Sequence, residues 1–499
     1  MFLVKKIYFV LTVVLFLMML SSCIPKNGGD DLVTIQEIDF NNEVQNVEVP
    51  YGTTEENAKL ELVQSIKIKD SDEEEHDVGL TWTIDNYNSQ QAGQYEATGT
   101  FELPEGVFQT EPLTELKVTA NVIVLDDVEE KFNLIIKSIP ENSGEVTSSQ
   151  KYLAETEVPL SAIENENWEF AYWEIPDSVV LVIGAKENEN ITIKMPSEDV
   201  TITAVFLFKK TGEKNTFTVG SVNFDMILST AATFPVGSED DEIKTVEKPF
   251  WIGETQLTYQ LWYTVRVWGE ANGYTFENIG REGSMGILDE PAPTDNKKHP
   301  VTTINWRDSI VWCNALSEML ELQPVYRYEG NIIRNSNNET ECVNAVQTDN
   351  NGFRLLTEWE WELSARYIGK DEPTEGPNLK DDAIYLNGLW WTPGEYASGA
   401  YAPWWVSEET SEVAWYASNS SSSNEVKGKR SNALDLFDMS GNVREWCFDV
   451  FNPEHSINSR VLRGGNFQDN ALGIRIFLRE SNNSSNKYGS YGFRIAKNF

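Results

Sequence analysis

The stretch Asn351-Gly352-Phe353-Arg354-Leu355-Leu356-Thr357-Glu358-Trp359-Glu360-Trp361-Glu362 decides how the C-terminal half of the chain folds. Thr357 and Glu360 have the spacing of a capping box. In that motif a threonine hydroxyl accepts from the third helical N–H, and the glutamate reaches back to the threonine N–H. Leu356 and Trp361 are placed to form the accompanying hydrophobic staple. The stretch therefore predicts a helix that starts directly after Thr357.

Two further helices are expected upstream of this one. Thr258 can cap the first, Gly273 can end it, and its apolar side consists of Leu261, Val265 and Trp268. In the second, apolar residues recur at helical spacing at Ile310, Cys313, Leu316 and Leu320. Long Gly-, Asn- and Ser-rich segments lie between and after the helices. This pattern is typical of a fold that displays loops on a compact scaffold.

Six ordered motifs in this half resemble those of the formylglycine-generating-enzyme (sulfatase-modifying factor) domain. They are 248–255 (KPFWIGET), 299–306 (HPVTTINW), 351–362 (NGFRLLTEWEWE), 436–446 (LFDMSGNVREW), 460–467 (RVLRGGNF) and 492–494 (GFR). The resemblance covers residues 216–499 and implies an α+β C-type-lectin fold rich in irregular loops. Leu356 departs from the pattern, since the family usually has proline there.

The family's chemistry is not expected in this chain. Its enzyme oxidises a substrate cysteine with two copper-binding thiols that follow the Gly-Gly pair, but residues 468–475 (QDNALGIR) contain no cysteine. No other side chain replaces a thiolate in that role. A second enzymatic branch holds iron with several histidines, whereas His76, His299 and His455 are too scattered to be expected to converge. An oxidase or modifying enzyme remains the alternative reading.

The resemblance also implies a calcium site, because the family binds Ca²⁺ near its Gly-Asn-x-x-Glu-Trp motif. That motif maps onto Asn442, the Val443 carbonyl and Glu445, which are oxygen ligands suited to a hard cation. The alternative is that Asn442 and Glu445 only brace the loop by hydrogen bonds. No other cofactor is expected.

Residues Arg460 to Arg494 resemble the variable region of diversity-generating-retroelement proteins, which use the same fold as a scaffold. Such systems mutate adenines, so Asn codons scatter to a limited set of residue types. The residues of those types that we expect to bind ligand are Asp469, Gly473, Phe477, Ser481, Tyr488, Ser490 and Tyr491. Gln468, Glu480 and Lys487 cannot arise in this way and should be fixed. An ordinary Asn/Ser-rich surface loop is the alternative.

Several tryptophans and three cysteines fall in the same half. Trp390, Trp391, Trp404, Trp405 and Trp415 lie in predicted loops, where they form either stacking surfaces or local cores. The cysteines after residue 23 are Cys313, Cys342 and Cys447, and no disulfide is assigned. Cys313 and Cys447 are surrounded by apolar and aromatic residues, which predicts that they are buried.

Two small all-β domains are expected before this half. Residues 33–127 alternate in short strands and resemble a bacterial immunoglobulin-like sandwich, with Trp82 in its core. Residues 131–208 are similar to the internalin-type B-repeat, a small β-grasp-like spacer. Its function is either adhesion or that of a stalk, and the stalk is favoured because no polar constellation stands out.

The N-terminus has the pattern of a bacterial lipoprotein signal. Lys5 and Lys6 precede an apolar stretch that ends in Leu20-Ser21-Ser22-Cys23. Residues 1–22 are therefore expected to be removed, Cys23 to be lipidated, and residues 23–32 to form a flexible tether. The expected location is the cell envelope, at the outer membrane or the cell surface.

The formal net charge of −40 and the pI of about 4.4 argue against nucleic acid as a partner, because phosphates would be repelled. The interpretation favoured by these patterns is a membrane-anchored binding protein whose lectin-fold head recognises a protein or another cell-surface ligand. A purely structural envelope lipoprotein is a further alternative.

Overall fold

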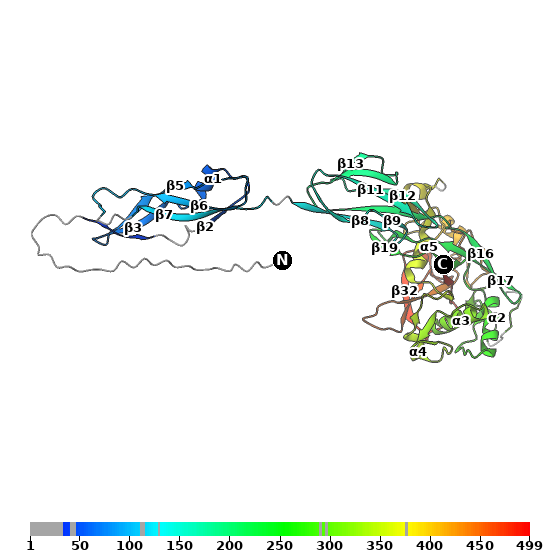
Figure 1. Ribbon diagram of the computed structural model, residues 1–499. Coiled ribbons are helices and arrows are strands. Elements are labelled where there is room, and N and C mark those ends of the chain that lie inside the picture. Colours follow the sequence, from blue (N-terminus) through cyan, green and yellow to red (C-terminus); the bar gives the residue numbers. More distant parts are fainter. Residues whose placement is uncertain are drawn as a thin grey trace, which may run out of the picture. The chain divides into compact units, whose positions relative to one another are not determined.

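The computed structural model describes residues 33–39, 46–109, 115–127, 130–288, 292–294, 298–374 and 378–499. Cys23 and the predicted signal and tether lie outside these residues. The chain divides into two compact units, residues 1–129 and 130–499 (Figure 1). Among the helices of the described segments, none combines the length and the apolarity needed to cross a membrane.

The first unit is a sandwich of two sheets. One sheet has the order β1-β3-β4 and the other β2-β7-β6-β5, in which β2 and β7 are parallel. The strands are β1 (Ile35–Asp39), β2 (Asn46–Val49), β3 (Ser65–Asp70), β4 (Glu75–Gly79), β5 (Thr81–Ile84), β6 (Gly93–Thr100) and β7 (Lys117–Val124). Trp82 is 5 % exposed in the core between them, as the sequence predicted. The alternation of strand residues therefore produced the expected fold.

One helix in this unit was not expected. The sequence indicated only short strands over residues 33–127, but the structure has a helix, α1 (Glu55–Glu61), which is capped by the Thr54 hydroxyl. The helix buries Ala58 and packs near β5. Its two glutamates in the first turn suit the positive end of a helix dipole, a signal that the strand-rich context masked.

The second unit begins with the repeat-like part, whose strands form two four-stranded sheets. Their orders are β10-β8-β15-β12 and β13-β14-β11-β9. The strands are β8 (Lys131–Ile139), β9 (Gly144–Val146), β10 (Gln150–Leu153), β11 (Glu157–Glu164), β12 (Trp168–Glu174), β13 (Val180–Ile183), β14 (Asn190–Lys194) and β15 (Val200–Phe208). Trp173 is fully buried between the sheets.

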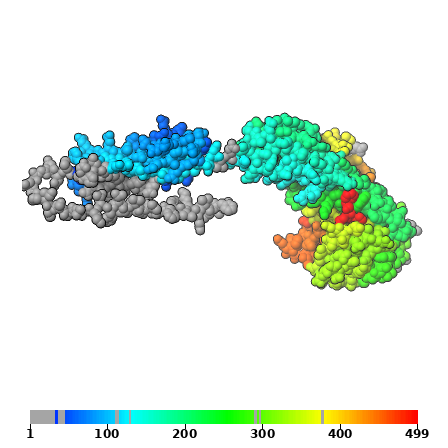
Figure 2. Space-filling view, viewed as in Figure 1, coloured from blue at the N-terminus to red at the C-terminus, as the bar shows by residue number. Residues whose placement is uncertain are grey.

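This part packs on the rest of its unit. Leu228 and Ala231 of the C-terminal half belong to the repeat's own hydrophobic cluster. The rings of Phe208 and Phe499 lie 5.3 Å apart, edge to face. Figure 2 shows the C-terminal residues in red beside the repeat-like part in cyan. The repeat is thus joined to the head by a shared core.

The head, residues 213–499, is built on a five-stranded sheet and a four-stranded sheet. Their orders are β16-β17-β20-β34-β26 and β32-β31-β30-β33. The larger sheet consists of β16 (Lys214–Val219), β17 (Val222–Ser229), β20 (Phe250–Gly253), β26 (Phe353–Leu355) and β34 (Ile495–Asn498). The smaller sheet consists of β30 (Arg444–Val450), β31 (Ser459–Arg463), β32 (Arg479–Asn483) and β33 (Tyr491–Phe493).

Short strands and helices fill the loops. The helices are α2 (Tyr259–Ala271), α3 (Trp306–Met319), α4 (Glu339–Val343), α5 (Glu358–Arg366), α6 (Leu379–Asp382) and α7 (Ser407–Val413). The small sheets contain β18 (Ala232–Val236), β19 (Glu242–Val246), β21 (Arg281–Glu282), β22 (Val301–Thr302), β23 (Tyr326–Tyr328), β24 (Asn331–Ile332), β25 (Val346–Gln347), β27 (Tyr367–Gly369), β28 (Ile384–Leu386) and β29 (Leu389–Trp391). A 3-10 turn, η2, spans Ala471–Ile474.

The expected capping box is confirmed at the start of α5. The Glu360 N–H donates to the Thr357 hydroxyl, and the Glu360 carboxylate accepts from the Thr357 N–H. Leu356 and Trp361 are both buried in the same cluster, as a hydrophobic staple requires. The change from proline to Leu356 therefore leaves the helix entry intact.

Candidate functional site

The C-terminal segment forms both edges of the smaller sheet, so its loops meet around one arginine. The Arg444 side chain, from β30, donates to Asp469 at 3.0 Å and to Glu480 at 2.8 Å. β30 runs parallel to β33, with Arg444 opposite Tyr491. The loop 464–478, the strand β32 and the loop 484–490 are thereby brought to one place. Arg444 lies within the motif 436–446, where only calcium ligands were expected from the sequence.

The Gly464-Gly465 pair allows the first of these loops to turn close to its neighbours. Both residues have positive φ, 86° and 66°. A Cβ at Gly465 would lie 2.3 Å from the Gly473 carbonyl oxygen, closer than any side chain tolerates. Only glycine fits both the conformation and the close approach.

The solvent-facing part of this place is polar and partly aromatic. The Tyr488 ring is 50 % exposed and lies edge to face with Tyr491, at 4.9 Å between centroids. Asn482 donates to the Tyr491 hydroxyl and accepts from Asn486. We call this surface the Arg444 face, and it consists of Arg444, Asp469, Glu480, Asn482, Asn486, Tyr488 and the Tyr491 hydroxyl.

A serine-rich loop borders the Arg444 face and was not singled out from the sequence. Residues 418–424 (SNSSSSN) follow Ala417, whose N–H donates to the Asp469 carbonyl oxygen at 2.9 Å. The serine-rich composition was visible, but nothing in the sequence placed this loop next to residues 40 positions or more downstream. It adds small adaptable hydroxyl and amide groups to the rim.

The seven residues expected to bind ligand are only partly brought together. Asp469 and Tyr488 belong to the Arg444 face, but Asp469 is also tied to the scaffold through Arg444. Ser490 and Tyr491 are each 7 % exposed, so nearly all of both side chains is withdrawn from a ligand. Tyr491 was expected to bind ligand, but its ring is buried because it packs against Trp446.

The other three residues lie elsewhere. Successive side chains of a strand point to opposite sides, so Ser481 faces away from Glu480 and Asn482. Phe477 is half-buried beneath the Arg475 guanidinium, which lies 4.6 Å from its ring and 5.9 Å from that of Trp404. Gly473 lies within η2, and its N–H donates to the Asn470 side chain that caps this turn.

The charged residues of the segment are anchored on the scaffold. Arg479 binds Glu358 in a bidentate pair, with two nitrogens each 2.7 Å from one oxygen. Arg475 contacts both oxygens of Glu395 at 2.7 Å through one nitrogen. The buried Arg463 pairs with Glu362 and donates to the carbonyls of Phe477 and Leu478. Bidentate arginine–carboxylate pairs fix geometry as well as charge. These contacts hold both ends of the loop 464–478.

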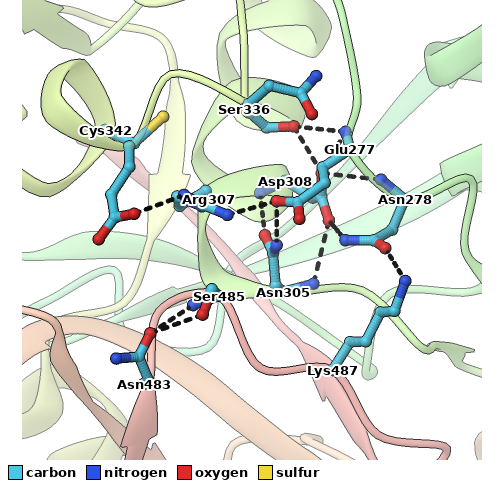
Figure 3. A network of polar contacts seen from close by, with 12 residues as sticks. Glu277, Asn278, Asn305, Arg307, Asp308, Ser336, Cys342, Asn483, Ser485 and Lys487 are labelled. Carbon is cyan, nitrogen blue, oxygen red and sulfur yellow. Dashed lines mark hydrogen bonds and ion pairs between the residues drawn. The ribbon is translucent and has the colours of Figure 1, made fainter.

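A buried polar network anchors the loop 484–490 (Figure 3). Lys487 donates from this loop to the Asn278 side-chain oxygen, and Asn278 donates in turn to Asp308 at 2.7 Å. Asp308 is fully buried at the start of α3, where it forms a capping box with Asn305. Burial raises the pKa of Asp308, but its contacts are donors that favour the ionised form.

Asp308 accepts five hydrogen bonds in all. One oxygen accepts from the N–H groups of Glu277 and Asn278 and from the Ser336 hydroxyl. The other accepts from the Asn278 side chain and the Asn305 N–H.

Three residues of the segment were expected to be fixed. Glu480 and Lys487 contact Arg444 and Asn278, whereas the Gln468 side chain is exposed.

The oxygens expected to hold calcium are already engaged with protein donors. The Asn442 side chain exchanges two hydrogen bonds with the Asn424 backbone, at 2.9 and 3.2 Å. The Val443 carbonyl accepts from Gln256 at 2.7 Å. Glu445 accepts from Trp361 and pairs with Arg494 through both oxygens. This arrangement does not fit a cation held by these three residues, and it favours the bracing role.

Four of the five tryptophans expected in loops are buried or half-buried, and one of them, Trp391, belongs to a hydrophobic core cluster. Trp391 is fully buried in β29, and the Trp415 ring is covered by the Lys429 ammonium at 4.1 Å. Trp405 is the exception, since it is 63 % exposed beside Trp404. It lies at the Arg475 end of the segment and is an available stacking surface.

The geometry of the head agrees with its sequence relationships. Residues 213–499 match the sulfatase-modifying factor enzyme 1-like domain. The chain belongs to the sulfatase-modifying factor enzyme 1-like family. Its earlier parts match other families: residues 135–210 match the divergent InlB B-repeat domain and residues 47–103 the bacterial Ig-like domain of group 4.

Two curated proteins show the range of this similarity. The chain is 27% identical over 256 residues to the chaperone protein LppX of Paenibacillus barcinonensis, which covers 49% of this chain and 79% of that protein. It is 30% identical over 168 residues to the formylglycine-generating enzyme of Streptomyces coelicolor, covering 29% of this chain and 46% of the enzyme. Less than half of the enzyme's length is therefore represented.

Solved structures similar to the chain include two that each cover more than half of it. Treponema denticola variable protein 1 is 28% identical with a TM-score of 0.42, covering 57% of this chain and 99% of that one. CarF is 25% identical with a TM-score of 0.41, covering 54% and 96%.

The thiols of this sulfatase-modifying factor head are placed as core residues. Cys313, Cys342 and Cys447 are free and buried, as expected for the first and the last. Burial raises the pKa of Cys342 to about 12 and that of Cys313 and Cys447 above the usual range. A thiol nucleophile or metal ligand must be a thiolate. None of these three is therefore suited to the oxidation of a substrate cysteine.

Proposed function

We propose that the chain is a cell-envelope lipoprotein whose head binds a ligand, most suitably a protein, through the Arg444 face. The proposal rests on the observation that some residues of the C-terminal segment bind the scaffold while others remain exposed. Its arginines and Lys487 hold the scaffold, whereas Tyr488 and the polar groups around Arg444 remain at the surface. A rigid frame with an adaptable surface is the arrangement that recognition requires.

The chemistry of this face resembles that of an antibody-like binding surface. Tyrosine supplies contact area at a small cost in conformational entropy, and Asn and Ser supply adaptable hydrogen bonds. The Arg444 charge is offset by Asp469 and Glu480, so the face carries no strong positive potential. A protein surface of mixed polarity fits these groups better than a polyanion.

The anchoring part of the proposal rests on the lipoprotein signal and Cys23. Lipidation there would hold the chain at the envelope, and the immunoglobulin-like domain and the B-repeat separate Cys23 from the head in the sequence. Diversification of the segment by a retroelement is included in the proposal and would explain why binding groups alternate with anchored ones.

The test compares ligands captured by two matched variants of the full chain. Tyr488→Ser removes half-exposed aromatic area from the Arg444 face, and Tyr385→Ser removes a ring of similar exposure, 53 %, outside the segment. A binder retained by wild type and Tyr385→Ser but lost by Tyr488→Ser, and then confirmed with purified proteins, supports the proposal. Equal retention by all three proteins contradicts it.

A further inference from the structure

A buried glutamine lies where backbone carbonyls of the 438–443 loop converge. Gln256 follows β20 and is completely buried. Its side-chain nitrogen is 3.1 Å from the Asp438 carbonyl oxygen, 3.3 Å from that of Gly441 and 2.7 Å from that of Val443. An amide has two N–H groups, so three acceptors crowd a donor that can satisfy two of them well.

Three carbonyl oxygens directed at one point form a negative cradle. Such a cradle suits a cation, and oxygen ligands of this type are those that Ca²⁺ accepts. In this chain a neutral amide fills the position instead. The assignment of nitrogen rather than oxygen is set by the contacts, because the opposite orientation would place a fourth oxygen against the three carbonyls.

We propose that Gln256 takes the place of a metal ion in this loop, so that the head of this chain keeps the loop folded without calcium. Two further atoms support the proposal. The Asp438 carboxylate, 2 % exposed, has one oxygen without a hydrogen-bond partner, and so does the Gln256 side-chain oxygen. A buried carboxylate oxygen normally has a hydrogen-bond donor or a cation as its partner. A cation at this position would need such an oxygen as a ligand, whereas the Gln256 amide does not.

The two carboxylate oxygens of Asp438 differ in their contacts. One accepts the Lys427 backbone N–H at 3.0 Å, and the other has no hydrogen-bond partner. Asp438 also has a left-handed backbone conformation, with φ of 58°. The loop therefore holds a strained residue and a poorly compensated carboxyl group, and the Gln256 amide is the contact that draws its carbonyls together.

The consequence is that removal of the amide should expose a latent cation site. In Gln256→Ala, the three carbonyls and the free Asp438 oxygen would face an emptied position. Four oxygen ligands completed by water can bind Ca²⁺ weakly, in the range of extracellular modules. Wild type should not respond to calcium at this position.

The experiment measures thermal unfolding of the full chain in EDTA and in millimolar calcium. For wild type, we expect that calcium does not raise the midpoint of unfolding through Asp438, so that Asp438→Asn does not change the response to calcium. Gln256→Ala should unfold several degrees lower in EDTA and recover part of that loss in calcium, and the double variant with Asp438→Asn should recover less. Terbium luminescence sensitised by nearby tryptophans should increase for Gln256→Ala alone.

A second variant keeps the test decisive if Gln256→Ala fails to fold. Gln256→Glu preserves the volume but directs an anion at the carbonyls, so it should depend on calcium more strongly than wild type. A calcium shift in wild type that Asp438→Asn abolishes would overturn the proposal. The proposal would also be overturned if the Gln256 variants unfolded at the wild-type midpoint in both EDTA and calcium.

Discussion

Asp308→Asn is the substitution whose effect can be worked out most directly from the structure. The change is nearly isosteric and removes one negative charge. One oxygen remains and keeps the contacts from Glu277, Asn278 and Ser336. The new amide nitrogen, however, faces two donors, the Asn278 side chain at 2.7 Å and the Asn305 N–H at 3.1 Å.

The expected loss follows from these two contacts. Each of these two donors is left without an acceptor, at a cost of about 1–3 kcal/mol each, so the free energy of unfolding of the head should fall by about 2–6 kcal/mol. For a domain of this size, that lowers the midpoint of thermal unfolding by at least about 4 °C. The side chain of Asn278 also loses its orientation, so the Lys487 contact and the loop 484–490 should loosen.

The assay combines thermal unfolding, followed by tryptophan fluorescence, with amide hydrogen exchange. Asp349→Asn is the matched control, because it removes the same charge from a side chain that is 92% exposed. The midpoint of thermal unfolding of the control should equal that of wild type. If Asp308→Asn unfolds at the control's midpoint, or if the loop 484–490 keeps its protection, then the network does not anchor the Arg444 face.

Three further predictions concern other parts of the chain. Burial raises the pKa of Asp449 from 3.8 to about 6, so the free energy of unfolding should fall as pH rises through this window. Asp449→Asn should not show this fall. In urea titrations from about pH 4 to pH 8, its free energy of unfolding should increase by about 1–3 kcal/mol relative to wild type. Cys313, Cys342 and Cys447 should not react with a thiol reagent until the head is denatured, because their pKa values are raised; rapid labelling of the native protein would refute their burial. Cys23→Ala should abolish lipidation and leave the chain unprocessed or released, whereas a processed variant that still partitions into detergent would show that the lipobox interpretation is wrong.

Local signals in the sequence were sufficient for much of the fold. The capping box of Thr357 and Glu360, the burial of Trp82 and the helical spacing of α2 and α3 depend on residues a few positions apart, and these features appear in the structure. The family motifs supplied the architecture of the head. The helix α1 was missed because its neighbours alternate as strands do.

The site depended on contacts between distant segments, which one sequence does not reveal. Asp308 meets Asn278 and Ser336 from separate loops, and Gln256 meets residues more than 180 positions away. Ser481 and Tyr491 were expected at the surface from their residue types. Strand alternation directs the first away from the Arg444 face, and packing against Trp446 buries the second.

The central claim is that the C-terminal segment combines a fixed scaffold with a changeable binding surface. Sequencing this locus across isolates tests it most directly. Differences should concentrate at the accessible positions of the Arg444 face that hold no scaffold contact, namely Asn482, Asn486 and Tyr488. Arg463, Arg479, Glu480, Lys487 and Arg494 should stay constant because they hold the scaffold. Substitutions spread evenly over residues 216–499, or frequent loss of these anchors, would contradict the account.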